Sequence, residues 1–139
     1  MRDNRRGSAL IEFAGSLILL SGVFAGIFQI GYTFFVYSTL VNSVCAGARY
    51  GSLQSDPSNP ANVDVIKRVR NLVVFGELAP APSAKPVVPG LTTDQVNVTL
   101  GPATVTVSVK GFKLDSLFSQ MKLDGRPTMT FPLTNGPAK

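Results

Sequence analysis

Glu12 is the side chain whose type and position most directly suggest chemistry. It lies inside the apolar stretch 8–20 (SALIEFAGSLILL) and is the fifth residue after Gly7. A carboxylate at the centre of a bilayer costs about 2.5–3.5 kcal/mol on insertion scales, and less near the membrane boundary. In the first turn of a helix, the macrodipole also favours an acidic side chain. These two effects are enough to explain a lone acid at this position.

The rest of the composition leaves little material for catalysis. The 139-residue chain has no histidine, so it lacks an imidazole for general-base catalysis and any histidine-based metal site. Its one cysteine, Cys45, excludes an intramolecular disulfide and is interpreted as a small buried side chain. A serine–lysine dyad stays open, although no spacing suggests one. We therefore expect no enzyme activity, no cofactor and no metal.

The element that carries Glu12 is predicted to be a membrane-spanning helix. No charged residue occurs between Glu12 and Arg49, a run of 36 positions, whereas a spanning helix needs about 20 apolar residues. A core helix of a soluble protein seldom continues so far without a charge. The run is also too long for a cleaved secretory signal, whose apolar region has about 7–15 residues. Three arginines among the first six residues place the N-terminus in the cytoplasm and the C-terminal part outside.

The segment around Glu12 resembles the junction that prepilin peptidases cleave. A short basic leader ends at Gly7, a glutamate is the fifth residue after it, and a long apolar helix follows. Over about the first 55 residues, the chain is similar to the TadE-like group of tight-adherence pilus proteins. Members of that group carry two arginines, a glycine, small residues and Glu-Phe, and then an apolar helix. The helix ends in a stretch similar to residues 46–51 (AGARYG) of this chain.

This resemblance implies a processing site, an assembly contact and a set of partners. Cleavage would fall between Gly7 and Ser8 and would remove the leader, residues 1–7. Glu12 would be the assembly carboxylate, paired with the free amino terminus of a neighbouring subunit, because two charges that are costly in a dry helix bundle become tolerable when paired. The implied partners are copies of the chain in a helical filament, a prepilin peptidase, the inner-membrane assembly machinery and, before assembly, the lipid bilayer.

Two sets of residues on the long helix, predicted over 8–53, are expected to pack one helix against another. Small residues at a four-residue spacing let helices approach closely, although glycine is also common in membrane helices generally. These small residues are Gly15, Gly22 and Gly26. Aromatic residues spaced four, four and three apart share one helical stripe, which we interpret as a packing surface. They are Phe24, Phe28, Tyr32 and Phe35.

Residues 54–139 are predicted to form a small extracytoplasmic domain, so the fold class is α+β. Helical spacing predicts a second, smaller helix over 64–77, and prolines make 79–90 a connector. Apolar and polar residues alternate in three segments, which predicts a three-stranded antiparallel sheet covered by the two helices. The predicted strands are 95–100, 103–109 and 128–131, a short helix is expected over 114–121, and a turn at 124–125.

The charges outside the long helix are interpreted as a solvated surface. The net charge of +5 divides into +2 for residues 1–7, −1 for Glu12 and +4 for residues 49–139. Lys67, Arg68 and Arg70 could bind a polyanion, but three cations supply little phosphate-binding energy. No nucleic-acid partner is therefore expected.

These features favour a structural, pilin-like subunit of an extracellular filament on the cell surface. The subunit would reach the surface through the cytoplasmic membrane and assemble by packing its N-terminal helix with neighbouring subunits. The alternative is a non-polymerising single-pass membrane pseudopilin or an accessory component of a pilus or secretion machine.

Overall fold

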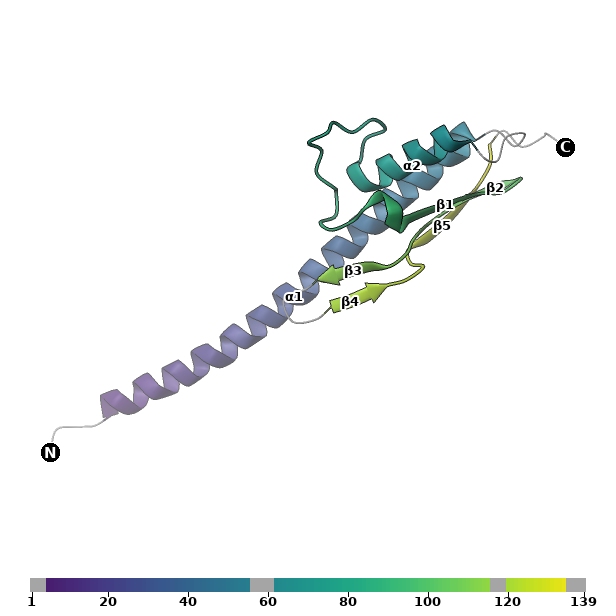
Figure 1. Cartoon of the computed structure of the whole chain (residues 1–139). Helices are drawn as coiled ribbons and strands as arrows, with labels where there is room; N and C mark the ends of the chain where they lie inside the picture. Colours follow the sequence, from purple (N-terminus) through teal and green to yellow (C-terminus); the bar gives the residue numbers. More distant parts are fainter. Residues whose placement is uncertain (1–4, 56–61, 116–119, 135–139) are drawn as a thin grey trace.

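The fold consists of one long helix and a small α+β unit built along its C-terminal half (Figure 1). The structure is a computed structural model that describes residues 5–55, 62–115 and 120–134. The helices are α1 (Arg5–Gln54), α2 (Val63–Phe75) and the short 3-10 helix η1 (Thr93–Gln95). The strands are β1 (Val96–Leu100), β2 (Thr104–Val109), β3 (Phe112–Asp115), β4 (Gln120–Leu123) and β5 (Thr128–Pro132). The predicted α+β class is confirmed.

Helix α1 runs without interruption for 50 residues, which corresponds to about 75 Å at 1.5 Å per residue. Several of its serine and threonine hydroxyls donate to carbonyl oxygens one turn earlier in the same helix. The hydroxyl of Ser21 donates to the carbonyl oxygen of Leu17 at 2.8 Å, and the hydroxyl of Thr39 donates to that of Phe35 at 2.9 Å. A hydroxyl bonded one turn back needs no water, so such residues are tolerated in a helix that enters hydrocarbon.

Helix α2 has a capping group at each end. The side-chain oxygen of Asn62 accepts from the backbone N–H of Val65 at 3.3 Å, which satisfies a free donor of the first turn. Gly76 has a left-handed φ of 75° and its N–H donates to the carbonyl oxygen of Leu72, a conformation that ends a helix. The helix is therefore shorter than the predicted 64–77. Lys67 and Arg68 are exposed, as predicted for a solvated face, whereas Arg70 is half-buried and its Nε has no hydrogen-bond partner among the described residues.

The predicted three-stranded antiparallel sheet is confirmed, with the strand order β1-β2-β5. Val107 in the central strand β2 is paired with Val98 on one side and Met129 on the other. The valines of β2 face the helices, whereas Thr106 faces outward and its hydroxyl lies 3.0 Å from that of Thr130. The apolar face packs on α1 through β2 and β5 and on α2 through β1.

The prediction of a short helix over 114–121 is wrong. Residues Phe112–Asp115 and Gln120–Leu123 instead form an antiparallel β3–β4 ribbon. Phe112 is paired with Leu123 at one end of the ribbon, and Asp115 is paired with Gln120 at the other. Phe112 and Leu114 are buried and Lys113 between them is exposed, which is the two-residue period of a strand. The packing of Phe112 and Leu114 on the core outweighs the local preference of this segment. Residues 116–119 lie outside the described residues.

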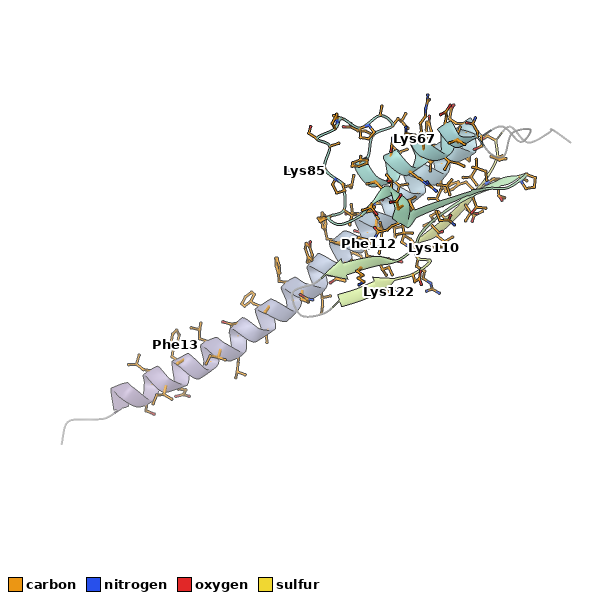
Figure 2. The ribbon with its side chains drawn as sticks, in the orientation of Figure 1. Phe13, Lys67, Lys85, Lys110, Phe112 and Lys122 are labelled. Atoms are coloured by element: carbon orange, nitrogen blue, oxygen red, sulfur yellow. The ribbon has the colours of Figure 1, made fainter. Side chains whose placement is uncertain are left out.

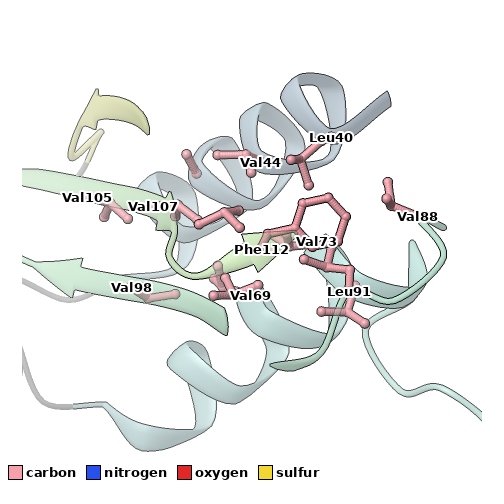
Figure 3. Packing of buried hydrophobic residues seen from close by; sticks show 14 of the residues in the cluster. Leu40, Val44, Val69, Val73, Val88, Leu91, Val98, Val105, Val107 and Phe112 are labelled. Atoms are coloured by element: carbon pink, nitrogen blue, oxygen red, sulfur yellow. The ribbon is translucent and has the colours of Figure 1, made fainter. Parts of the chain in front are cut away.

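The hydrophobic core lies between α1, α2 and the sheet (Figure 3). Its members follow the period of the element that carries them, every four residues on a helix and every two on a strand. They include Val36, Leu40, Val44 and Ala48 of α1, Val65, Val69 and Val73 of α2, and Val105, Val107 and Val109 of β2. The core therefore uses only the second half of α1.

Two glycines of α1 allow this core to form. A Cβ on Gly47 would clash with Cγ2 of Val73 in α2, and a Cβ on Gly51 would lie 3.0 Å from Cγ1 of Val105 in β2. Both residues are buried. They form a GxxxG pair, so within this chain the pattern lets α1 approach its own domain closely.

Candidate assembly surface

The first half of α1, residues 7–35, is the candidate site, because none of its residues is buried. Figure 2 shows side chains around all sides of this projecting segment, Phe13 among them. Ile18, Phe28 and Phe34 expose 73%, 65% and 71% of their surface. Large contiguous apolar surfaces of this kind mark membrane or protein interaction sites.

The dimensions of the projecting segment match those of a bilayer. Residues 7–35 extend about 44 Å at 1.5 Å per residue, and a bilayer with its headgroup regions is about 40–45 Å thick. The helix is long and apolar enough to cross a membrane, and none of its most apolar 18-residue window is buried. A core helix of a soluble protein would bury such a window against its own domain. The projecting segment is therefore built for a membrane or for other chains.

Glu12 lies on the third turn of α1 and is exposed. Ser8 precedes it by four residues, so the two residues share one helix face about 6 Å apart along the axis. Gly7 and Ser8 both lie in the helix and are exposed. Helix α1 begins at Arg5, so residues 5–7 of the predicted leader continue the helix rather than precede it.

The predicted small residues lie on the side of α1 that faces the domain. Eighteen residues make five full helical turns, so residues eighteen apart point in the same direction. Gly22 and Gly26 are therefore aligned with Leu40 and Val44, which are fully buried against the domain. A Cβ on Gly15, Gly22 or Gly26 would meet nothing within 4 Å. This glycine face (Gly15, Gly22 and Gly26) is thus unoccupied by any described residue.

Most of the predicted aromatic stripe lies on the opposite side of the helix, whereas Tyr32, at its edge, lines a groove together with Phe112 of the domain. Five turns beyond Phe24 and Phe28 are Asn42 and Ala46, and both of these residues are exposed on the outer side of α1. The stripe itself is exposed by 40% to 65% of its surface. Its members are Phe24, Phe28, Tyr32 and Phe35. The projecting segment therefore has two unlike faces, one of small residues and one of large aromatic residues.

The described residues include no group of three His, Cys, Asp or Glu side chains that could hold a metal ion. Cys45 is a free thiol and is half-buried rather than fully buried.

Two features of the structure were missed in the sequence. One is the role of Gly47 and Gly51 in packing α1 on its own domain, which their four-residue spacing could have indicated. The other is the pair of exposed lysines on the β3–β4 ribbon, Lys113 and Lys122. The alternation of charged and apolar residues at 112–114 and 121–123 could have indicated it.

The described residues thus contain one exposed apolar helix, long enough to cross a membrane, followed by a small α+β domain. Residues 7–49 match the family model described as TadE-like protein. The resemblance stated from the sequence is therefore confirmed for this segment, which begins at the projecting part of α1 and ends at Arg49. TadE-like proteins are pilus-associated components, so the match supports a pilus-associated role in general. No curated protein and no solved structure matches the chain.

Proposed function

We propose that this chain is a structural subunit of an extracellular filament. It inserts into the cytoplasmic membrane through α1, with the N-terminus in the cytoplasm, and assembles by packing residues 7–35 against the same segment of neighbouring copies. The observation that carries this proposal is the projecting segment, which is apolar, unburied and two-faced. The TadE-like match over residues 7–49 supports the same role.

The two faces of the projecting segment favour an open assembly over a closed dimer. A glycine face accommodates a bulky neighbour, and the aromatic stripe supplies bulky side chains. If the stripe of one copy packs on the glycine face of the next, the growing assembly keeps a free stripe at one end and a free glycine face at the other. Such heterologous contacts continue into a filament unless the rotation closes a ring.

The energetics of the segment also favour association outside the bilayer. In lipid, apolar side chains gain nothing from contact with one another beyond packing. In water, each large apolar side chain that becomes buried stabilises the assembly by about 1.5–3 kcal/mol. The apolar surface of residues 7–35 is therefore removed from water either by the membrane or by the core of a filament.

Processing between Gly7 and Ser8 is part of the proposal. We expect the chain purified from its native source to begin at Ser8, since the new amino group would supply the charge that pairs with Glu12. Intact mass spectrometry measures this directly as the loss of residues 1–7. A chain that retains Met1 in assembled material would contradict the processing step.

Cysteine cross-linking tests the polymerisation of the chain. In a Cys45→Ser background, a cysteine on the glycine face (Gly22→Cys or Gly26→Cys) is combined with one on the stripe (Phe24→Cys or Phe28→Cys). We expect at least one combination to give a ladder of multimers on oxidation. The single-cysteine variants are the matched controls, because one thiol per chain links two chains at most.

The cross-linking pattern also separates this function from the alternative. A pseudopilin or accessory component that does not polymerise would give no multimers larger than a dimer in any combination. That result would contradict the filament proposal.

A further inference from the structure

The β3–β4 ribbon is amphipathic and has no role in the contacts proposed above. Phe112 and Leu114 are buried on its inner side, whereas Lys113 and Lys122 are exposed. The two lysines are directly opposite each other in the register of the ribbon, an arrangement of like charges that is unfavourable by itself. Among the side chains that the structure describes, no carboxylate forms an ion pair with either lysine.

The ribbon lies beside α1 at the level where the helix leaves the domain (Figure 1). A groove of about 550 Å³ separates them, lined by Ile30, Phe34, Leu114, Leu123 and three further residues of α1. A second groove of about 470 Å³ joins Tyr32 and Val36 of α1 to Lys113. The ribbon therefore borders residues 29–37, next to the last exposed turns of the projecting segment.

This level corresponds to the outer surface of the membrane. If Glu12 marks the cytoplasmic boundary, a hydrocarbon core of about 30 Å extends for about 20 residues and ends near Tyr32. Tyr32 and Tyr37 are exposed by 40% and 38%, and tyrosine is enriched at membrane interfaces. Lys113 and Lys122 then lie among the lipid headgroups of the outer leaflet.

From this placement we propose that the β3–β4 ribbon binds anionic phospholipid headgroups before assembly. The ribbon turns its apolar side toward the helix and the acyl boundary and its lysines toward lipid phosphates, as amphipathic interfacial elements do. Residues 110–126 carry four cations against two acids, Asp115 and Asp124, so the local charge is positive. A phosphate shared by Lys113 and Lys122 offsets their mutual repulsion. The inference rests on the membrane insertion proposed above.

The cations of α2 provide a matched control within the same chain. Val69 of α2 packs at Gly51 of α1, which is 19 residues beyond Tyr32 and therefore about 28 Å farther along the axis. Charges act over about 8–10 Å at moderate salt, so Lys67 and Arg68 lie beyond the reach of the headgroups. Figure 2 shows Lys122 on the β3–β4 ribbon and Lys67 on α2.

Hydrogen exchange of the full chain in lipid nanodiscs tests the proposal. We compare discs of phosphatidylcholine alone with discs that also contain phosphatidylglycerol. Amides of residues 120–123 and 112–115 should exchange more slowly in the anionic discs, and added salt should remove the difference. Each lysine near an anionic surface contributes about a fivefold change in the bound-to-free ratio. The double variant Lys113→Gln/Lys122→Gln should lose the difference, and Lys67→Gln/Arg68→Gln should keep it.

The same measurement distinguishes failure of this inference from failure of the proposed function. Protection of residues 13–32 with a ribbon that is indifferent to lipid charge would overturn the lipid proposal alone. Exchange of residues 13–32 at the rate of a free helix would overturn membrane insertion, and the lipid proposal with it. Ribbon protection that depends on the number of chains per disc, and not on lipid charge, would assign the ribbon to a second copy of the chain and overturn the lipid proposal.

Discussion

Replacement of Glu12 by alanine is expected to abolish filaments and to leave membrane insertion intact. Glu12 is the single charge that the projecting segment carries between Gly7 and Phe35. Removal of a carboxylate does not weaken insertion, since the acid costs up to about 2.5–3.5 kcal/mol in the membrane. In a filament core, the variant leaves the neighbouring amino terminus buried without a partner, and breaking a buried pair costs about 3–5 kcal/mol. Immunoblots of sheared surface material and of membranes measure both effects.

Two further variants define what Glu12 contributes. Glu12→Gln keeps the size and the hydrogen-bonding oxygen but removes the charge, so it should also fail to assemble. Ser16→Ala changes a residue one turn further on the same face and should assemble normally. Filaments of Glu12→Gln at the wild-type level would show that the charge is not an assembly contact.

The second large effect is expected at Gly47, inside the domain. A Cβ at this position would clash with Val73, whose β-branched side chain has little freedom to move. Overpacking of this kind costs about 1–3 kcal/mol, and the gain of about 1 kcal/mol that alanine brings to a helix offsets only part of the upper range. We expect Gly47→Ala to lower the thermal midpoint of the full chain in detergent by up to on the order of 10 °C. Circular dichroism measures this change.

Gly22→Ala is the matched control for Gly47→Ala. A Cβ at Gly22 meets nothing within 4 Å, so the thermal midpoint should stay the same or rise slightly through helix propensity. Equal midpoints for Gly47→Ala and Gly22→Ala would contradict the close approach of α1 to α2.

Much of this fold follows from local patterns that tertiary contacts reinforce. The long helix was predictable because a run of uncharged residues bounded by Glu12 and Arg49 leaves few other structures open. Strands β1 and β2 were predictable because valine alternates with threonine, asparagine or serine along both. The β3–β4 ribbon was not, since the spacing of Leu114 and its apolar neighbours fits a helix and only the core contacts of Phe112 decide otherwise.

The division of α1 into a packed half and a projecting half was beyond sequence reasoning. Both halves are rich in apolar residues and carry a single charge each between Gly7 and Gln54, and both contain GxxxG pairs, Gly22–Gly26 and Gly47–Gly51. Only the position of the domain shows that the second pair is buried and the first is free. The roles of Gly7, Ser8 and Glu12 stay predictions for a different reason. Their proposed partners are a peptidase and a neighbouring copy, and a single chain brings neither into contact with them.

Electron microscopy of sheared cell-surface material tests the central claim most directly. We expect filaments that antibodies against this chain decorate along their whole length, and a helical reconstruction with α1 of successive copies packed at the filament axis. Recovery of the chain solely in membrane fractions, with undecorated filaments or none in the sheared material, would contradict the claim that it is a filament subunit.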